Sequence, residues 1–559
     1  MVKKFFSIFN REITGLHEAA YLLAFFAFFS QVLALVRDKL LAYTFGAGST
    51  LDIYYAAFRI PDLIFVSIAS VVSASVLVPF FIDKIHHSPA EGRRFVSNIF
   101  TVFFFSIVAA SAVAYIYAPY LLGILLPGFV NDPLLPDLIT ATRILLLSPI
   151  LLGISNFFSS ITQMHKRFLV YALSPLVYNM GIIMGIVFLY PKLGLNGLMW
   201  GVIGGSFLHM AIQIPFILGK GVFPGFSVNI DWASIRRVVL ISLPRTLTLS
   251  SNHLASFFLI ALASLMSGGS ISIFTLALNL QSVPLSIVGV SYSSAIFPTL
   301  SRFFVEGRRS GFLEKVIESA RHIIFWSIPI TVLFIVLRAQ IVRTVYGAGN
   351  FDWADTKLTA AVLALFIVSV TGQCLVLLFI RAYYAEGKTA KPLIVNIISS
   401  AMIAVLGYVF TKAFFAFPVF RYFLEDLLKV SGQPGTSVLV LPLAYSIGVL
   451  INTYLHWHMF GRDYPGFTRP VLSALFHSFA ASVIMGYVTF VFLRFFNIFF
   501  SLEKAWGVFL QGFFAGIVGI VSLIAVLVLL KNRELKEVWT TLHHKIWKAK
   551  VILPDQEGL

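Results

Sequence analysis

The sequence predicts an all-helical integral membrane protein, and three observations lead to that fold class. The 559 residues are 58% hydrophobic and only 12% charged, whereas soluble domains carry about 25% charged residues. Apolar runs of the roughly 20 residues needed to cross a bilayer recur along the chain, for example Val102–Leu122 and Trp506–Leu530. The basic residues gather in the short segments between these runs, as in membrane proteins that cross the bilayer many times.

Hydropathy and turn residues place about fourteen spans, two of them at the C-terminal end as additions to a twelve-helix body. The spans cover approximately residues 17–45, 51–82, 96–125, 136–163, 168–190, 194–218, 238–266, 270–300, 316–337, 358–380, 392–411, 436–460, 470–493 and 505–530. The first twenty residues are basic, but no cleavage site of small residues follows them, so we expect no signal peptide.

The distribution of positive charge predicts that both termini lie in the cytoplasm. If the N-terminus is inside, the cytoplasmic segments hold the majority of the 41 Lys and Arg residues, as the positive-inside rule requires. This placement also explains the net charge of +17 without a nucleic-acid partner. The tail after Leu530 is basic with aromatic residues on a helical spacing, which fits either a helix on the anionic inner leaflet or a solvated flank.

Two stretches that resemble each other predict an internal duplication. One begins at Gly48 and the other at Gly269, and each opens with Gly-Ser, continues with Ser- and Ala-rich apolar sequence and closes on Pro before a Phe pair. They fall in spans two and eight, the offset expected for two six-helix halves around a central site. The predicted organisation is an amphipathic N-terminus (1–16), an N-lobe (17–220), a C-lobe (221–460), two added spans (461–530) and a basic cytoplasmic tail (531–559).

Ionisable side chains inside the predicted spans are the candidates for a binding site, because each costs at least ~2.5–3.5 kcal/mol near the bilayer centre. The dense group is Arg37, Asp38 and Lys39 with Asp52, Arg59 and Asp62. One interpretation is structural: Arg37 and Asp38 neutralise each other or sit in a helix break, and so stabilise the fold. The other is that Arg37 and Arg59 line a water-filled cavity and bind an anionic head such as a phosphate, with the aspartates orienting them.

Signatures of enzymes and metal sites are missing from the sequence. It holds no P-loop for ATP and no nucleophile elbow. The His residues near span ends lack the carboxylate or Cys neighbours of a metal site. The single Cys374 lies in an apolar run, which is typical of a small core residue. We therefore expect no cofactor and no metal.

Several motifs resemble the MurJ (MviN) lipid II flippase family of the MOP superfamily. They are VRDKLLAYTFGAGSTLDIYYAAFRIPDL from Val36, KRFLVYALSPLVYN around Pro175, GLNGLMWGVIGGSFLHMAIQIPFI from Gly194, SVPLSIVGV with Pro284, YGAGNFDWADTKLTAAVLAL from Tyr346 and RAYYAEGKTAKP from Arg381. The resemblance implies a MATE-like bundle with two lobes around a cationic cavity. It also implies alternating access that moves a lipid-linked cell-wall precursor from the inner to the outer leaflet of the bacterial cell membrane.

The resemblance places family residues that are important for function at Arg37, Asp38 and Asp52, and a frequent basic residue at Arg59. The sequence departs from the family pattern elsewhere: other cavity arginines would fall at Gln31, Phe65 and Asn279, an acidic residue at Ser70, and a sodium-linked aspartate at Leu259. We expect the anionic head to be held by Arg37 and Arg59, with Arg245 as a further candidate.

Four functions remain open from the sequence. The first is lipid II flipping driven by an ion gradient or the membrane potential, and the second is export of another lipid-linked oligosaccharide. The third is a non-transporting membrane scaffold. The fourth is a membrane-embedded glycosyltransferase or ligase, for which only Asp352 and Asp355 offer outer-face carboxylates. Expected partners are the lipid-linked precursor, membrane lipids and, from the resemblance, peptidoglycan synthases; the expected state is a monomer.

Overall fold

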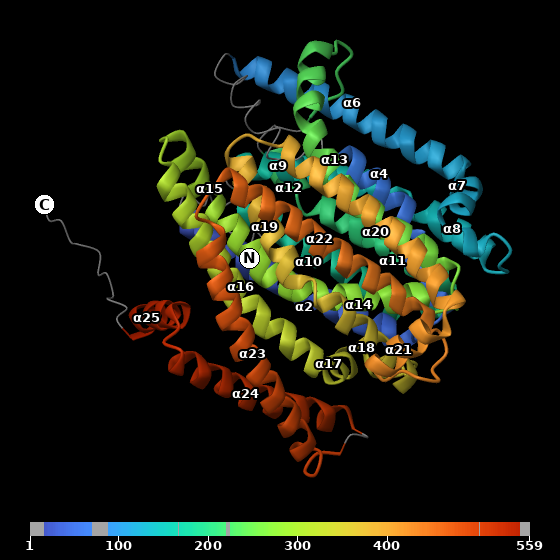
Figure 1. The fold of residues 1–559 in the computed structure, drawn as a ribbon. Helices are drawn as coiled ribbons and strands as arrows, with labels where there is room; N and C mark the ends of the chain where they lie inside the picture. The colour runs from blue at the N-terminus through green and yellow to red at the C-terminus, as the bar shows by residue number, and fades with distance from the viewer. Residues whose placement is uncertain (1–15, 70–87, 166, 220–223, 502–503, 548–559) are drawn as a thin grey trace, which may run out of the picture. The chain divides into compact units, whose positions relative to one another are not determined.

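The computed structural model describes residues 16–69, 88–165, 167–219, 224–501 and 504–547. Every regular element in these ranges is a helix (Figure 1), which confirms the predicted all-helical fold class. The predicted amphipathic N-terminus lies outside the described residues except for its last position. The end of the second predicted span and the last twelve residues of the tail also lie outside them.

Nine helical segments in the described ranges are long and apolar enough to cross a membrane, and a bent pair adds a tenth. The nine are Glu91–Ile116, Leu135–Gln163, Leu169–Leu218, Ser270–Val305, Arg309–Val336, Ala390–Ala416, Thr436–Asp463, Thr468–Phe496 and Ala505–Leu529. The bent pair is Trp353–Ile367 with Val370–Ala385, whose axes differ by 41°. Each of these segments overlaps a predicted span.

The segment Leu169–Leu218 accounts for two predicted spans, because its 50 residues would extend roughly 75 Å as one helix, against a hydrocarbon core of about 30 Å. The chain turns at Gly194, whose φ of 57° and ψ of −144° are not helical. Helices α2 (Leu16–Phe45) and α13 (Trp232–Ser264) lie at two further predicted spans. The total of fourteen spans stays a prediction.

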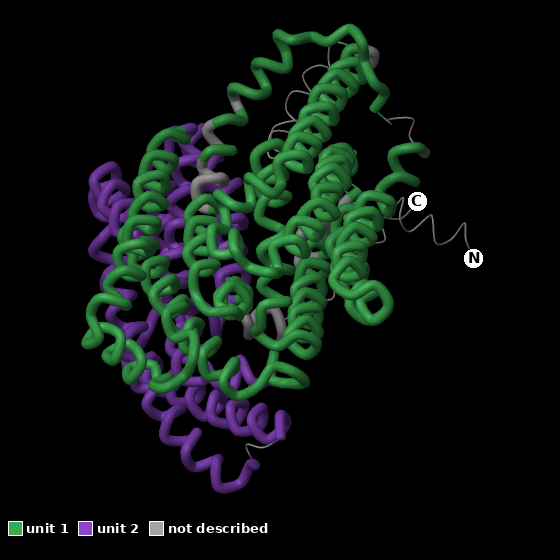
Figure 2. Tube along the Cα trace, turned by 90° about the vertical axis from the view of Figure 1, so that its right-hand side faces the viewer, with its two compact units in different colours: residues 1–283, 345–366, 388–452 green, residues 284–344, 367–387, 453–559 purple. Residues whose placement is uncertain are grey.

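The chain divides into two compact units, shown in green and purple in Figure 2. Unit 1 comprises Met1–Val283, Val345–Phe366 and Lys388–Asn452. Besides α2 and α13 it contains α3 (Ser49–Ala57), α4 (Arg59–Ala69), α6 (Pro89–Ile116), α7 (Ala118–Leu125), η1 (Pro127–Phe129), α8 (Leu135–Leu145), α9 (Leu147–Met164), α10 (Phe168–Met184), η2 (Gly185–Leu189), α11 (Tyr190–Ala211), α12 (Ile214–Gly219), most of α14 (Ser270–Pro284) and of α18 (Trp353–Ile367), α20 (Ala390–Ala416), α21 (Pro418–Leu428), η4 (Thr436–Leu439) and the first half of α22 (Val440–Asp463).

Unit 2 comprises Pro284–Thr344, Ile367–Gly387 and Thr453–Leu559. Its elements are η3 (Leu285–Val290), α15 (Ser291–Val305), α16 (Arg309–Val336), most of α17 (Arg338–Tyr346), α19 (Val370–Ala385), the end of α22, α23 (Thr468–Phe496), α24 (Ala505–Leu529) and α25 (Arg533–Trp547). η2 and η3 are short π-helical turns. The predicted division into lobes at residue 220 stays a prediction.

Within unit 1, α10 and α11 pack backbone to backbone through two glycine pairs. A Cβ atom added to Gly181 would lie 2.3 Å from the Cα of Gly205, and one added to Gly185 would lie 2.5 Å from the Cα of Gly201. In both helices the two glycines are four residues apart, which is the small-residue spacing that lets membrane helices approach closely. These glycines therefore fix the α10–α11 contact.

The core of unit 2 joins α15, α16 and α19 to the end of α22 and the start of α23. Phe312, Phe379 and Phe460 are fully buried in it. Cys374 of α19 is also fully buried there, as expected for a small core residue. The aromatic rings of Phe379 and Phe460 lie 5.4 Å apart, within the range in which aromatic pairs attract each other beyond their burial.

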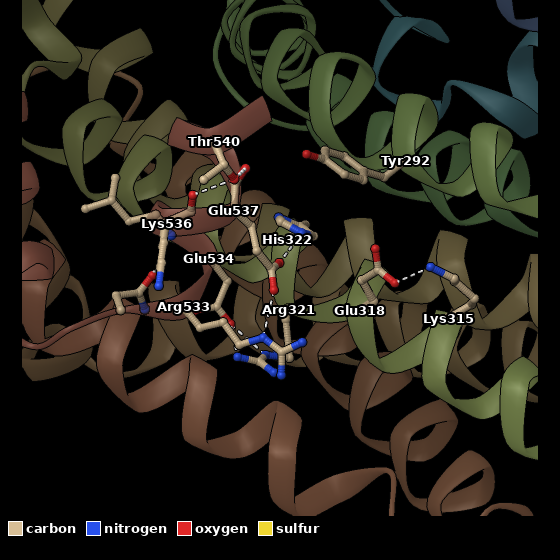
Figure 3. A network of polar contacts seen from close by, with 12 residues as sticks. Tyr292, Lys315, Glu318, Arg321, His322, Arg533, Glu534, Lys536, Glu537 and Thr540 are labelled. Carbon is tan, nitrogen blue, oxygen red and sulfur yellow. Dashed lines mark hydrogen bonds and ion pairs between the residues drawn. The ribbon is translucent and has the colours of Figure 1, made fainter. Parts of the chain in front are cut away.

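The tail helix α25 docks on α16 through the polar network in Figure 3. Arg321 of α16 donates from Nε to Oε1 of Glu534 at 2.6 Å, and its Nη2 forms an ion pair with the same oxygen at 2.6 Å. His322 Nε2 lies 3.2 Å from Oε2 of Glu537. Leu535 and Val538, on the same side of α25, pack against a cluster of α16, α23 and α24 residues. Residues 533–547 of the predicted basic tail are thus an ordered helix fixed to unit 2.

Replacing Glu534 by alanine is expected to loosen α25, because it leaves the largely buried Arg321 guanidinium without its carboxylate. Loss of a hydrogen bond to a charged group costs about 1.5–3 kcal/mol. Hydrogen exchange of residues 533–540 should therefore become faster. The matched control is Arg302→Ala, which removes an exposed ion pair outside α25. Exchange of residues 533–540 that is as slow in Glu534→Ala as in this control would contradict the role of Glu534.

The docking is also expected to depend on pH. Burial alone would raise the pKa of the Glu537 carboxyl, but the hydrogen bond from Arg533 and the charges of Arg533, His322 and Arg321 outweigh burial and lower that pKa. A lowered pKa means that the contribution of Glu537 is present at neutral pH. It is lost as the pH falls below the ordinary value of 4.5. The protection of the α25 amides, which is the observed exchange rate compared with the intrinsic rate at the same pH, should fall below that pH, and unchanged protection would contradict this assignment.

Candidate functional site

Arg37 and Asp38 form a hydrogen-bonded pair near the C-terminal end of α2 in unit 1. The Arg37 guanidinium donates to Oδ1 of Asp38 from Nε at 3.0 Å and from Nη2 at 2.8 Å. The Asp38 side chain is 3% exposed and the Arg37 side chain is 20% exposed. The pair therefore neutralises a carboxylate buried inside a predicted span, as one of the two interpretations from the sequence expected.

Two asparagines from other helices complete this cluster. Nη1 of Arg37 donates to Oδ1 of Asn179 on α10 at 3.0 Å, and Nδ2 of Asn279 on α14 donates to Oδ2 of Asp38 at 2.9 Å. Asn179 is itself held by a 3.0 Å hydrogen bond from its Nδ2 to the carbonyl of Pro175. We call Arg37, Asp38, Asn179 and Asn279 the arginine cluster; it ties α2, α10 and α14 together.

The arginine cluster leaves part of the Arg37 guanidinium available for a ligand. A guanidinium has five N–H groups, and three of them are used by Asp38 and Asn179. The other two have no acceptor among the described residues, and the side chain is partly exposed. A phosphate oxygen is the kind of acceptor that these groups bind most strongly. Asp38 and Asn179 fix the orientation of the guanidinium, so a phosphate would meet preorganised donors.

Asp52 of α3 binds the N-terminus of α14 rather than an arginine. Its Oδ2 accepts from the Gly269 N–H at 2.6 Å, and its Oδ1 accepts from the N–H and the hydroxyl of Ser272 at 2.7 and 2.5 Å. The side chain is 5% exposed. Asp52 thus supplies from another helix the acceptor that the first turn of α14 requires, and this role was not visible in the sequence.

The two Gly-Ser stretches of the predicted duplication meet at this point. Each begins a helix, α3 after Gly48 and α14 after Gly269. A Cβ atom on Gly269 would lie 2.0 Å from the carbonyl oxygen of Ala47, and one on Gly268 would lie 2.5 Å from the Ser49 hydroxyl. Glycine is required at position 269 for two reasons: a Cβ atom would collide with the Ala47 carbonyl, and the φ of +90° is unfavourable for other residues.

Arg59 has contacts different from those of Arg37. It begins α4, and its Nε donates to the carbonyl of Tyr55 at 3.1 Å, while its guanidinium lies 5.7 Å from the centre of the Phe257 ring. These contacts are a local hydrogen bond and a cation–π interaction. The structure thus gives Arg59 no described contact with the arginine cluster. Arg245 lies within α13, and its side chain is outside the described part of the structure.

The structure shows the contacts of three positions that depart from the family pattern. Asn279 belongs to the arginine cluster, so an amide stands beside Asp38 where the family would place an arginine. Phe65 packs against the apolar core that joins α6, α9 and α12. Leu259 is fully buried, and a Cβ atom on Gly407 would lie 2.7 Å from its Cδ2. Gln31 is half-buried on α2, and Ser70 lies outside the described residues.

Asn350 and Asp355, in the motif that begins at Tyr346, form hydrogen bonds with the end of α2 and the turn after it. Asn350 donates from its backbone N–H to the carbonyl of Tyr43 at 2.9 Å and from Nδ2 to the carbonyl of Thr44 at 2.7 Å. Asp355 accepts from the Ala47 N–H at 3.1 Å. Asp355 therefore holds the α2–α3 turn. This structural contact does not favour the catalytic role that a transferase would give the carboxylate. Within the described ranges no group of three His, Cys, Asp or Glu side chains could hold a metal ion.

Comparison with known proteins relates the chain to one family of membrane transporters. Residues 41–510 match the family described as "Lipid II flippase MurJ". The lipid II flippase MurJ of Burkholderia cenocepacia is 24% identical over 393 residues, which are 69% of this chain and 76% of that protein. These matches confirm the family resemblance of the sequence motifs.

Solved structures show the same fold. A structure titled "Lipid II flippase MurJ, inward closed conformation" superposes with a TM-score of 0.72 at 21% identity, covering 90% of this chain and 98% of the other. A multidrug resistance MATE family transporter of the MOP superfamily, in an inward-facing conformation, superposes with a TM-score of 0.63 at 13% identity. The superposition covers 79% of this chain and 95% of the transporter. The predicted MOP/MATE-like architecture is confirmed.

Proposed function

The chain belongs to the MurJ lipid II flippase family of transporters, and from this premise we propose that it flips lipid II, a lipid-linked peptidoglycan precursor, from the inner to the outer leaflet. The proposed mechanism is alternating access. The observation that carries the proposal is the arginine cluster. It holds a partly exposed guanidinium, inside a predicted span, with two N–H groups that have no acceptor in the described part of the chain. Such a group suits the pyrophosphate of a lipid-linked substrate.

Each member of the proposed substrate site has its own role. Arg37 binds a phosphate oxygen, and Asp38 and Asn179 orient the guanidinium through their hydrogen bonds. Arg59 and Arg245 add positive charge from α4 and α13. Asp52 acts indirectly. It holds the start of α14 and so positions Asn279, which binds Asp38.

Because the sequence has no P-loop, we propose that this chain by itself does not use ATP to drive flipping. An ion gradient or the membrane potential is the proposed source. The position of the family's sodium-linked aspartate is filled here by Leu259, whose buried apolar side chain offers no oxygen ligand. The proposal therefore places no sodium site on α13.

The departures at Asn279, Phe65 and Gln31 favour a second candidate, the export of a different lipid-linked oligosaccharide. Fewer positive side chains would meet the head group than the family pattern implies, so a substrate with less negative charge would fit as well. Both candidates use the same fold and the same Arg37. They differ in the head group that is transported, which only a transport measurement separates.

We further propose a multi-pass protein of the bacterial cell membrane with both termini in the cytoplasm, acting as a monomer with peptidoglycan synthases nearby. The charge distribution of the loops supports this orientation. It places the exposed Lys192 in an external loop and the exposed Thr540, on α25, inside.

Cysteine labelling is expected to report this orientation, because the one native cysteine is fully buried. In spheroplasts, a membrane-impermeant maleimide should label Lys192→Cys but label Thr540→Cys only after permeabilisation. The unmodified chain, with Cys374 alone, serves as the background control. Labelling of Thr540→Cys in intact spheroplasts would contradict the cytoplasmic tail.

Complementation tests the proposed function in cells. The resident lipid II flippase of a bacterial host is depleted, and growth is followed with this chain or its variants, with membrane insertion checked by immunoblot. Rescue by the wild type supports lipid II flipping. Arg59→Ala should weaken rescue, whereas Arg302→Ala, which removes an exposed ion pair with Glu306, should not. No rescue by a well-inserted wild type would favour the second candidate or a scaffold.

A further inference from the structure

A cavity of about 700 Å³ lies between α6, α8, α9 and α11 in unit 1, and none of its lining residues belongs to the arginine cluster. Its volume falls within the range of ligand pockets, about 300–1,000 Å³. Most of its lining is apolar, including Val108, Ala112, Ile144 and Ile150. The volume and lining suit a hydrocarbon chain.

Two polar groups interrupt the apolar lining. Ser111 is 3% exposed, and its hydroxyl has no hydrogen-bond partner among the described residues. Arg143 donates from Nε to the carbonyl of Tyr115 at 3.2 Å, and its guanidinium lies 5.0 Å from the centre of the Tyr115 ring. The Tyr115 contacts hold the charged group at the edge of an apolar space, with its terminal nitrogens pointing to no carboxylate among the described residues. A buried, unpartnered hydroxyl and a cation without a carboxylate together indicate a missing anionic ligand.

Exposed tyrosines mark the depth of Arg143 in the membrane. Tyr115, Tyr117 and Tyr120 are 50%, 56% and 68% exposed, and such rings gather at the level of the lipid head groups. Along α6 the cavity runs from this level at Ile116 to Val108, a distance of roughly 12 Å at 1.5 Å per residue. The charged end of the cavity thus lies at head-group level and the apolar end in the hydrocarbon region.

We propose that this cavity binds one anionic phospholipid, with its phosphate on Arg143 and an acyl chain between α6, α8, α9 and α11. A single guanidinium matches a single phosphate, because the two can form paired N–H···O bonds. A free phosphate would leave the apolar part of the cavity empty. None of the residues that line the cavity belongs to the arginine cluster, so this lipid site is distinct from the proposed substrate site.

The experiment measures lipid binding by native mass spectrometry of the full chain, delipidated in a non-ionic detergent. The probes are phosphatidylglycerol, phosphatidylcholine, diacylglycerol and undecaprenyl phosphate. Wild type should retain one phosphatidylglycerol more firmly than the other three lipids. Arg143→Gln should weaken phosphatidylglycerol binding about tenfold, as expected for the loss of a charged hydrogen bond, and leave diacylglycerol binding unchanged.

Two further variants keep the test decisive if Arg143→Gln proves unstable. Ala112→Trp fills the apolar cavity and should weaken both phosphatidylglycerol and diacylglycerol. Lys192→Gln removes an exposed cation from α11 outside the cavity and should change neither. Equal phosphatidylglycerol affinity in wild type, Arg143→Gln and Ala112→Trp would overturn the site. A wild-type preference for undecaprenyl phosphate that Arg143→Gln or Ala112→Trp removes would overturn the assignment to a phospholipid, whereas undecaprenyl phosphate binding that both variants retain belongs to Arg37.

Discussion

Arg37→Ala is expected to abolish rescue of a flippase-depleted host and to lower the stability of the protein. The substitution removes the proposed phosphate ligand and leaves the Asp38 carboxylate buried with only Asn279 as a described partner. Breaking a buried pair by removing one member costs about 3–5 kcal/mol. Growth, immunoblots of inserted protein and thermal unfolding in detergent measure the two effects separately.

A double variant distinguishes the two interpretations of Arg37. In Arg37→Ala/Asp38→Ala the unpaired charge is gone, so most of the lost stability should return, but rescue should still fail because no guanidinium remains. Arg37→Lys retains the charge without the planar fork that binds Asp38 and Asn179 together, and should rescue only weakly. If the double variant supports growth, Arg37 serves the fold alone and the proposed substrate site is wrong.

Asp52→Ala is expected to cause a large loss of stability, although Asp52 does not contact the proposed substrate. It deletes the acceptor for the Gly269 N–H and for both donors of Ser272 in a buried environment. Each buried donor left unsatisfied costs about 1–3 kcal/mol. The Ser272 hydroxyl keeps the Gly48 carbonyl as a second acceptor at 3.4 Å, so the two backbone N–H groups set the expected loss at about 2–6 kcal/mol. Thermal unfolding measures this loss, and transport is compared per folded molecule.

Ser272→Ala is the graded control for Asp52, because it removes one of the three donors and should cost only about 1 kcal/mol. Asp52→Asn retains the side-chain size and one acceptor oxygen, so its loss of stability should lie between those of Ser272→Ala and Asp52→Ala. A normal unfolding temperature for Asp52→Ala together with lost transport would place Asp52 at the substrate and contradict its role as the helix cap of α14.

Much of the fold could be predicted because a bilayer restricts the choices. Backbone groups in hydrocarbon must bond within their own segment, so long apolar runs in this composition become helices. The break at Gly194, inside α11, was predictable as a gap between two apolar runs. The close α10–α11 contact needed the structure, since the spacing of Gly181 and Gly185 indicates a partner without identifying it.

The site was predictable only in part. The local pair Arg37–Asp38 is adjacent in sequence, so its mutual neutralisation could be expected. Asn179 and Asn279 lie 142 and 241 positions from their partners, and single-sequence periodicity carries no information on such pairs. Asp52 was expected to orient arginines, whereas its contacts are with α14. The only polar side chains in the first turn of α14 are those of Ser270 and Ser272, and its need for an external acceptor becomes clear only once α3 is placed beside it.

Lipid II translocation by the purified chain in proteoliposomes tests the central claim most directly. Lipid II is placed in one leaflet, a membrane potential is imposed, and its appearance in the other leaflet is followed for wild type, Arg37→Ala and Arg37→Ala/Asp38→Ala. The account predicts translocation by the wild type alone. Equal rates for the wild type and the well-folded double variant, or no lipid II movement by a wild type that moves another lipid-linked oligosaccharide, would contradict it.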